Sequence, residues 1–404
     1  MQLVWFLTIG AIFSIVLGEF GQYPFGSTTF SISFTDFFIG VIMMLLLIWQ
    51  VQTKTLPKKI PKFLWFYLVF WLICIISLVV SMRFSGITYL VRFLIYSSSV
   101  YLGYSLIQAK VTNYVRIFQV IFISGVLLSL VGFFQFYFYP DLEPLYMYGF
   151  DPHKNRLFST FLDPNLLGTY LNISLISGLC LYWRNRTGFW TSQNDKLKLF
   201  LIGVIVAAIV LTFSRSAYVM LVVELLIFFS FYSRRILFGI VVLGLLIGLF
   251  VQPVQERIRG AFSVDQSASE RIVSWQNGVY LVSRNPVLGV GFNNIRESQI
   301  ENKLLRTNQK SDVNSGSGLD SSLLFVGATT GIIGLLSFIS LFIYLAISLL
   351  QNWKSEIKLF AVCLIALSFA IMINSQFINS LFFTPILFVW SLLVGVWYST
   401  ITKN

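Results

Sequence analysis

Long apolar stretches separated by short polar segments run through the whole sequence. Most of them contain about 20 residues, the length that an α-helix needs to cross the hydrocarbon core of a bilayer. They lack the alternating segments of roughly ten residues that form membrane β-barrels. The sequence therefore predicts an all-α integral membrane protein in which residues 1–404 form one polytopic domain with about 12 transmembrane helices. The predicted spans are residues 3–18, 31–50, 63–82, 85–108, 116–139, 165–183, 198–213, 217–233, 236–252, 321–349, 358–376 and 380–399.

Two polar connections are longer than the others, residues 140–164 and residues 253–320. Within the second, apolar residues recur at helical spacing and form one stripe, which predicts an amphipathic helix that ends at Pro286. The stripe consists of Ile272, Trp275, Val279 and Val282. A second helix is expected over residues 292–308. The amphipathic helix either tethers the loop to the bilayer surface or forms a lid over a cavity.

The composition agrees with a membrane protein. Hydrophobic residues make up 57% of the chain and charged residues only 11%, whereas a soluble domain contains about 25% charged residues. A chain with so little polar surface cannot cover its own exterior in water. This excludes a soluble enzyme, a disordered protein and a secreted disulfide-rich scaffold.

The net charge of +12 is distributed unevenly between the two sides of the predicted membrane. With the N-terminus in the cytoplasm, the inner connections contain fifteen basic and two acidic residues, and the outer connections contain twelve basic and thirteen acidic residues. This is the positive-inside distribution. It predicts cytoplasmic N- and C-termini and places both long loops outside. The basicity therefore reflects topology, and no nucleic-acid partner is expected.

Arginine outnumbers lysine on the predicted outer side, with nine arginines and three lysines. The planar guanidinium group binds phosphate through two hydrogen bonds and keeps its charge when partly buried. Arg215 is the clearest candidate, because it lies in a very short connection, residues 211–216, close to the bilayer surface. It either fixes the depth of that hairpin by snorkelling or binds an anionic group such as phosphate.

Arg92 and Glu224 are the two charged residues that lie deep within predicted spans. Each lies about eight residues from the outer end of its helix, or roughly 12 Å deep at about 1.5 Å per residue. An isolated charge at that depth costs several kcal/mol, so each needs a partner. We expect the two to pair or to line one water-filled cavity. A buried ion pair without a role in substrate binding is the alternative.

Three other ionisable residues are candidates for chemistry on the outer side. Asp320 begins the tenth predicted span and is either a catalytic base or a helix N-cap. Asp163 precedes Pro164, which is the pattern of an N-cap followed by proline at the first helical position. His153, the single histidine, is expected to be an exposed loop residue, with proton transfer as the alternative. One histidine cannot form a two-histidine metal site.

Four stretches resemble those of the O-antigen polymerase and O-antigen ligase family of bacterial membrane glycan transferases. They are residues 156–165 with Gly168, residues 211–215, the set Arg271, Trp275, Asn285, Pro286, Gly289 and Gly291, and Asp320 and Ser321 followed by Gly331 and Gly334. The four occur in the order that the family shows. Where ligases of the family carry histidine, this chain has Asp320, which favours the polymerase branch.

The resemblance implies transfer of a glycan from a polyprenyl diphosphate to a sugar hydroxyl of another lipid-linked repeat unit, outside the bacterial cytoplasmic membrane. It implies a metal-independent, inverting glycosyltransferase without a cofactor. Asp320 would be the base, and the diphosphate would be held by Arg215, Arg271, Arg156 and Arg284. Its expected partners are the lipid-linked glycan, membrane lipid and a glycan flippase or chain-length regulator. The alternatives are a ligase, a secondary transporter and a non-catalytic scaffold.

Overall fold

The computed structural model describes residues 1–24, 31–54, 61–148, 150–184, 193–239, 266–305, 318–353 and 357–402, with the single residues 242, 249 and 255. In this part of the chain, α-helices make up most of the structure, with one short antiparallel sheet. Nine of the described helices are long and apolar enough to cross a membrane. This agrees with the predicted all-α integral membrane protein.

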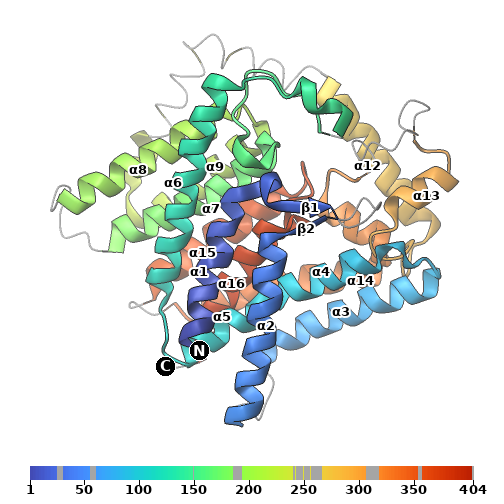
Figure 1. Ribbon diagram of the computed structural model, residues 1–404, viewed down its shortest axis with the longest axis horizontal. Helices are drawn as coiled ribbons and strands as arrows, with labels where there is room; N and C mark the ends of the chain where they lie inside the picture. Colours follow the sequence, from blue (N-terminus) through green and yellow to red (C-terminus); the bar gives the residue numbers. More distant parts are fainter. Residues whose placement is uncertain are drawn as a thin grey trace.

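The elements follow one another along the chain as shown in Figure 1. They are α1 (Gln2–Ser14), η1 (Ile15–Gly21), β1 (Gln22–Pro24), β2 (Ser31–Ser33), α2 (Phe34–Thr53), α3 (Lys62–Ser81), η2 (Phe84–Gly86), α4 (Ile87–Ser97), α5 (Ser99–Gln108), α6 (Tyr114–Phe138), η3 (Glu143–Tyr148), η4 (Ser159–Phe161), α7 (Pro164–Arg184), α8 (Gln193–Leu211), α9 (Arg215–Tyr232), α12 (Gln266–Arg284), α13 (Ile295–Glu301), α14 (Ser322–Gln351), α15 (Lys358–Asn374), η6 (Ser380–Phe382) and α16 (Thr384–Thr402).

Three of the twelve predicted spans differ from the nine long apolar helices. The span at 198–213 corresponds to α8, which has three charged residues in its first turns, and the span at 358–376 corresponds to α15, which is shorter than the others. The predicted span at 236–252 falls mostly outside the described residues. Both predicted helices of the large loop are present, as α12 and α13.

Helices α7 and α16 lie at the centre of the bundle and are buried along most of their length. Helix α7 packs against α6, α8, α9 and α15, and α16 packs against α4 and α5. A helix that is apolar on all sides is stable only in such a position or in lipid. By contrast, α2 and α3 leave many large apolar side chains uncovered, as expected for faces that contact lipid.

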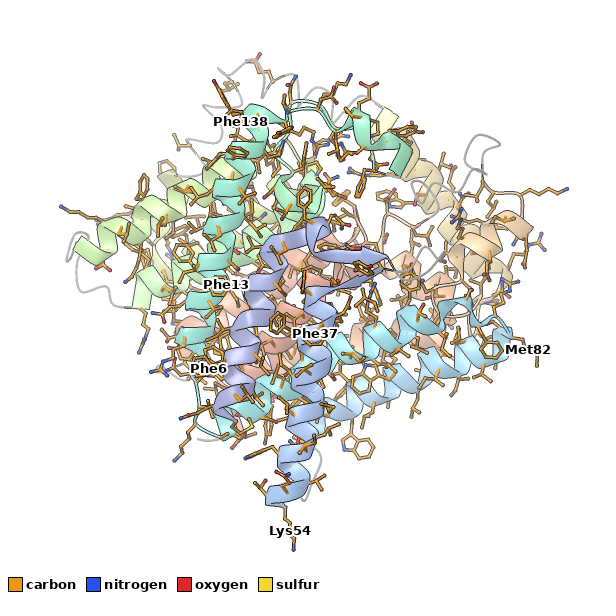
Figure 2. All side chains as sticks on the ribbon, in the orientation of Figure 1. Phe6, Phe13, Phe37, Lys54, Met82 and Phe138 are labelled. Carbon is orange, nitrogen blue, oxygen red and sulfur yellow. The ribbon has the colours of Figure 1, made fainter. Side chains whose placement is uncertain are left out.

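The described ends of the chain lie opposite residues 140–148 and α12 (Figure 1). Helix α1 begins and α16 ends at the lower end in Figure 1, while residues 140–148 and α12 lie toward the upper part. Lys54, at the end of α2, and Phe138, at the end of α6, are likewise far apart (Figure 2). We call the end that contains residues 140–164 and the start of α12 the loop end.

Helix α14 is broken at Gly331, where φ is +68°. The break releases backbone groups that an unbroken helix would pair internally, and the segment 286–291, which follows α12, pairs with them. The bonds run from Val290 N to Ala328 O at 2.8 Å, from Gly291 N to Thr329 O at 3.2 Å and from Ile332 N to Pro286 O at 2.8 Å. The large loop is therefore fixed to α14 by backbone hydrogen bonds.

Two glycines allow this close approach. A Cβ atom at Gly331 would lie 2.1 Å from the carbonyl oxygen of Val287, and one at Gly289 would lie 2.3 Å from the carbonyl carbon of Thr329. Both glycines have positive φ, which L-residues rarely adopt. Gly289 and Gly331, which belong to the predicted motifs, are therefore explained by close packing of the loop backbone against α14.

Candidate functional site

Arg156 joins the first long loop to the short hairpin before α9. Its Nε donates a hydrogen bond to the carbonyl oxygen of Thr212 at 2.9 Å, and its Nη2 donates to Oδ1 of Asn165 at 3.3 Å. Its Nη1 lies 3.4 Å from Nδ1 of His153. The guanidinium group is half-buried. Two of the predicted motifs, residues 156–165 and 211–215, are therefore in direct contact.

Arg215 is the first residue of α9 and is held next to this contact. The N-cap of α9 is Ser214, whose hydroxyl accepts from the backbone N–H of Ala217 at 3.3 Å. The same hydroxyl donates to Oδ1 of Asn165 at 2.7 Å. The helix N-terminus adds a partial positive charge to that of the half-buried Arg215. Such an arrangement favours an anion.

Asp163 is an N-cap, as predicted. Its Oδ1 accepts hydrogen bonds from the backbone N–H groups of Asn165 at 2.6 Å and Leu166 at 3.1 Å. It therefore fixes the start of α7, from which Asn165 reaches both Arg156 and Ser214.

Asp320 is not the N-cap of α14, so that interpretation is wrong. The helix begins at Ser322, and Ser321 caps it by accepting a hydrogen bond from the N–H of Leu324 at 3.3 Å. Asp320 is instead held by α12: its backbone N–H donates to Oγ of Ser274 at 2.9 Å, and Nε1 of Trp275 donates to its carbonyl oxygen at 3.5 Å. The carboxylate is thus not required for the cap.

Several charged groups surround the Asp320 carboxyl. Burial raises its pKa, the nearby Arg271 guanidinium lowers it, and the negative charges of Asp163 and Glu270 raise it further. The charge of Asp151 also interacts with Asp163, Glu270 and Asp320. We call Asp151, Asp163, Glu270, Arg271 and Asp320 the Asp320 cluster.

His153 lies beside this cluster and is half-buried, so the expectation of an exposed loop histidine is wrong. Burial and the positive charge of Arg156 lower its pKa to about 4, although Asp163 opposes the shift. The imidazole is therefore neutral at neutral pH, and its Nδ1 accepts from Arg156.

Neither Ser274 nor Glu270 was predicted to belong to the site. Ser274 lies three residues after Arg271, which places both on one helix face. This spacing could have indicated that Ser274 lies near Arg271, but it could not predict that this face of the helix contacts Asp320. Among the described residues, no group of three His, Cys, Asp or Glu side chains is arranged to hold a metal ion.

Arg284 lies away from the Asp320 cluster. It is 13 residues from Arg271 on the same helix, which corresponds to about 20 Å along the axis. Its guanidinium carbon lies 5.4 Å from the centroid of the Tyr280 ring, and the side chain is exposed. Because α12 is continuous, one diphosphate cannot contact both arginines.

The predicted pairing of Arg92 with Glu224 is wrong. Arg92 Nη2 lies 2.9 Å from Oδ2 of Asp36, and it also donates to the carbonyl oxygen of Ser31. Asp36 lies in the capping box that begins α2. Glu224 is fully buried in α9, and within the described part of the chain neither of its carboxylate oxygens has a hydrogen-bond partner. The two residues thus belong to separate environments.

A family comparison agrees with the motifs that the sequence predicts. Residues 199–339 match the family model of O-antigen ligase. No curated protein matches the chain. The family match confirms the resemblance predicted from the sequence, and it supports glycan transfer of the O-antigen ligase or polymerase type.

The O-antigen ligase match covers three of the four predicted motifs. It includes the hairpin at 211–215, the face of α12 with Arg271, and Asp320 with the glycines of α14. The first motif, residues 156–165, lies before the matched region but contacts it through Arg156 and Asn165.

Proposed function

We propose that the chain is a glycan polymerase. It transfers a polyprenyl-diphosphate-linked oligosaccharide to the sugar hydroxyl of another lipid-linked repeat unit, on the extracytoplasmic face of a bacterial cytoplasmic membrane. The observation that carries this proposal is the position of Asp320, a half-buried carboxyl group that does not cap its helix and that lies beside Arg271.

In the reaction, the acceptor oxygen attacks the anomeric carbon of the donor glycan while the bond from that carbon to the diphosphate oxygen breaks. Asp320 accepts the proton of the acceptor hydroxyl as a general base. The diphosphate leaves as an anion, and Arg271, Arg215 and Arg156 stabilise the charge that develops on it. One displacement inverts the anomeric configuration, and no metal takes part in the proposed step.

The donor site uses three of the four predicted arginines. Arg156 and Arg215 lie at the contact between two motifs, and Arg271 lies in the Asp320 cluster, which includes Asp163 of the first motif. Arg284 is left out because of its distance along α12.

Ligase-type transfer to a different acceptor is the second candidate, since the family model carries that description. The lipid-linked glycan profile of a deletion strain separates the two. Loss of a polymerase leaves single repeat units on the lipid carrier, whereas loss of a ligase leaves long chains that are not attached to the final acceptor. Restoration of long chains by the wild-type chain supports the proposal, and accumulation of long unattached chains in the deletion strain contradicts it.

A further inference from the structure

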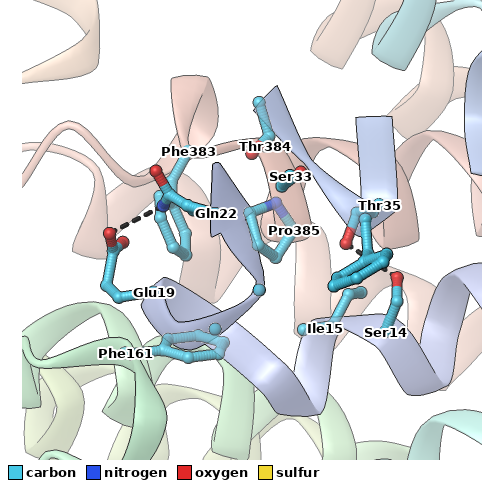
Figure 3. A pocket seen from close by; sticks show the side chains of 13 residues that line it. Ser14, Ile15, Glu19, Gln22, Ser33, Thr35, Phe161, Phe383, Thr384 and Pro385 are labelled. Atoms are coloured by element: carbon cyan, nitrogen blue, oxygen red, sulfur yellow. Dashed lines mark hydrogen bonds between the residues drawn. The ribbon is translucent and has the colours of Figure 1, made fainter. Parts of the chain in front are cut away.

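A small hollow lies at the outer end of α1, next to the motif that contains Asp163 (Figure 3). Six of its lining residues come from the two end regions of the chain and from its middle. They are Glu19 of η1, Gln22 of β1, Thr35 of α2, Phe161 of η4, Phe383, and Thr384 of α16. The cavity volume of the hollow is about 40 Å³, enough for a few water-sized groups. The hollow therefore suits the edge of a sugar ring better than a whole oligosaccharide.

The lining combines polar side chains with aromatic rings. The carboxylate of Glu19 accepts a hydrogen bond from Nε2 of Gln22 at 2.7 Å, and the hydroxyl of Thr35 lies 2.8 Å from that of Ser14. The rings of Phe161 and Phe383 meet edge to face, with centroids 5.5 Å apart. A few polar groups among apolar walls are typical of small-ligand sites. Hydroxyl groups on an apolar ring, as in a sugar, fit this combination.

The hollow is connected to the Asp320 cluster through both of its aromatic walls. Phe161 lies two residues before Asp163, and the charge of Asp163 interacts with those of Glu19 and Asp320. On the other side, Phe383 directly follows η6.

Helix η6 is itself bonded to the residue that begins α14. The hydroxyl of Ser322 donates to Oδ1 of Asn379 at 2.8 Å and accepts from the N–H of Leu381 at 3.3 Å. Ser322 lies two residues after Asp320. The hollow is thus linked, through these packed and hydrogen-bonded segments, to the segment that carries the proposed base.

Gly18 fixes the hollow against the first motif. Its φ is +52°, and a Cβ atom there would lie 2.2 Å from the carbonyl oxygen of Thr160. The hydroxyl of Thr160 in turn donates to the carbonyl oxygen of Val16 at 2.8 Å. The turn that carries Glu19 is therefore packed directly on the segment that carries Phe161 and Asp163.

The charge of the lining indicates which part of the substrate it accepts. None of the described lining residues is lysine or arginine, so the hollow offers no cation to a diphosphate. The arginines of the donor site lie elsewhere at the loop end. We propose that the hollow around Glu19 binds the hydroxyl-bearing edge of the acceptor sugar and positions its hydroxyl for Asp320. This inference rests on the proposed glycan transfer, with Glu19 as a positioning and specificity residue.

The test measures binding of two probes to the purified full-length chain in detergent. The first is the free repeat-unit oligosaccharide, released from the lipid of the deletion strain, and the second is polyprenyl diphosphate without a glycan. Glu19→Gln should weaken oligosaccharide binding by about two- to tenfold, since a typical hydrogen bond contributes about 0.5–1.5 kcal/mol. Its affinity for polyprenyl diphosphate should stay at the wild-type value. Arg271→Ala should show the opposite pattern.

Two further variants guard against a folding effect. Thr384→Val, a nearly isosteric change at another wall, should weaken oligosaccharide binding by about two- to tenfold. Glu143→Gln makes the same chemical change as Glu19→Gln at an exposed residue of η3 and should leave both affinities unchanged. Wild-type oligosaccharide affinity in both Glu19→Gln and Thr384→Val would overturn the proposal.

A trimmed oligosaccharide distinguishes acceptor from donor sugar. Removal of the sugar furthest from the lipid with an exoglycosidase should abolish the affinity difference between wild type and Glu19→Gln. If the difference persists, the hollow binds an inner sugar of the donor, and the acceptor assignment is overturned. Failure of polyprenyl diphosphate to bind the wild-type chain would instead contradict the proposed function.

Discussion

The two ends of α12 contact α14 in different ways. At the N-terminal end, Ser274 and Trp275 hold the backbone of Asp320, and the guanidinium of Arg271 lies near its carboxyl. Beyond the C-terminal end, the segment 286–291 pairs with the backbone at the break around Gly331. The first contact presents ionisable side chains, whereas the second consists of backbone groups and glycines. We therefore expect substitutions at the first contact to affect activity and substitutions at the second contact to affect stability.

Asp320→Asn should have the largest effect on activity. The substitution keeps the shape of the side chain and removes the base, so the rate of polymer formation should fall by about 10²–10⁴-fold. Ser321 caps α14, and the backbone N–H of Asp320 binds Ser274 without its carboxylate. The midpoint of thermal unfolding in detergent should therefore stay within a few degrees of wild type. Near-normal polymer length and rate in this variant would rule out Asp320 as the base.

Arg271→Ala should give the next largest loss. Removing a group that stabilises developing negative charge costs about 10²–10³-fold in rate. Arg284→Ala is the matched comparison, since it makes the same change on the same helix about 20 Å away. We expect a far smaller loss there, measured as initial rates with lipid-linked repeat units. Equal losses in the two variants would show that the distance along α12 does not separate their functions.

Gly331→Ala should act on stability instead. With φ +68° and ψ −169°, Gly331 adopts a conformation that is almost confined to glycine and costs another residue about 1–3 kcal/mol. The added Cβ would also lie 2.1 Å from the carbonyl oxygen of Val287. The unfolding midpoint should fall, while the rate per folded molecule changes little. Gly203→Ala is the control, because it lies in α8 with nothing within 4 Å of its added Cβ. It should leave the midpoint unchanged or raise it. A Gly331→Ala variant that is stable but inactive would show that this contact is needed for activity and not for stability.

Local patterns in the sequence were enough to predict the helices and one cap. Long apolar runs locate the buried α7 and α16, and the Asp163–Pro164 pair identifies the start of α7. The sequence left open whether Asp320 caps α14, because aspartate and serine both suit the position and the choice depends on where the helix begins.

Contacts between distant parts of the chain were harder to predict. Arg92 pairs with Asp36, 56 residues earlier, and Asp320 is held by Ser274, 46 residues earlier. No periodicity relates such pairs, because tertiary packing decides them. The hollow at Glu19 was missed for the same reason, since its walls come from both ends of the chain.

The pH dependence of the rate gives the smallest but most specific test of the Asp320 cluster. Because burial raises the pKa of Asp320, protonation should remove the base at a higher pH than for an ordinary aspartate, and the rate should fall as the pH decreases through that value. Glu270 and Arg271 are adjacent in the sequence but act on this pKa with opposite sign. Glu270→Gln removes a negative charge and should shift the acidic limb of the pH–rate profile to lower pH. Arg271→Ala should shift the limb of its residual activity to higher pH.

His153 provides the control for this profile. Its pKa is about 4, so it carries no proton to lose across the neutral range, and His153→Gln should leave any limb above pH 5 in place. The measurement compares the rates of the wild-type chain and the three variants from about pH 5 to pH 8, the range in which an unperturbed histidine titrates. It decides whether Asp320 or His153 is the base. If the acidic limb of the pH–rate profile disappears in His153→Gln and does not move in Glu270→Gln, the base is His153 and not Asp320. Opposite shifts in the Glu270 and Arg271 variants, by contrast, would require a titrating group that responds to both charges, as Asp320 does.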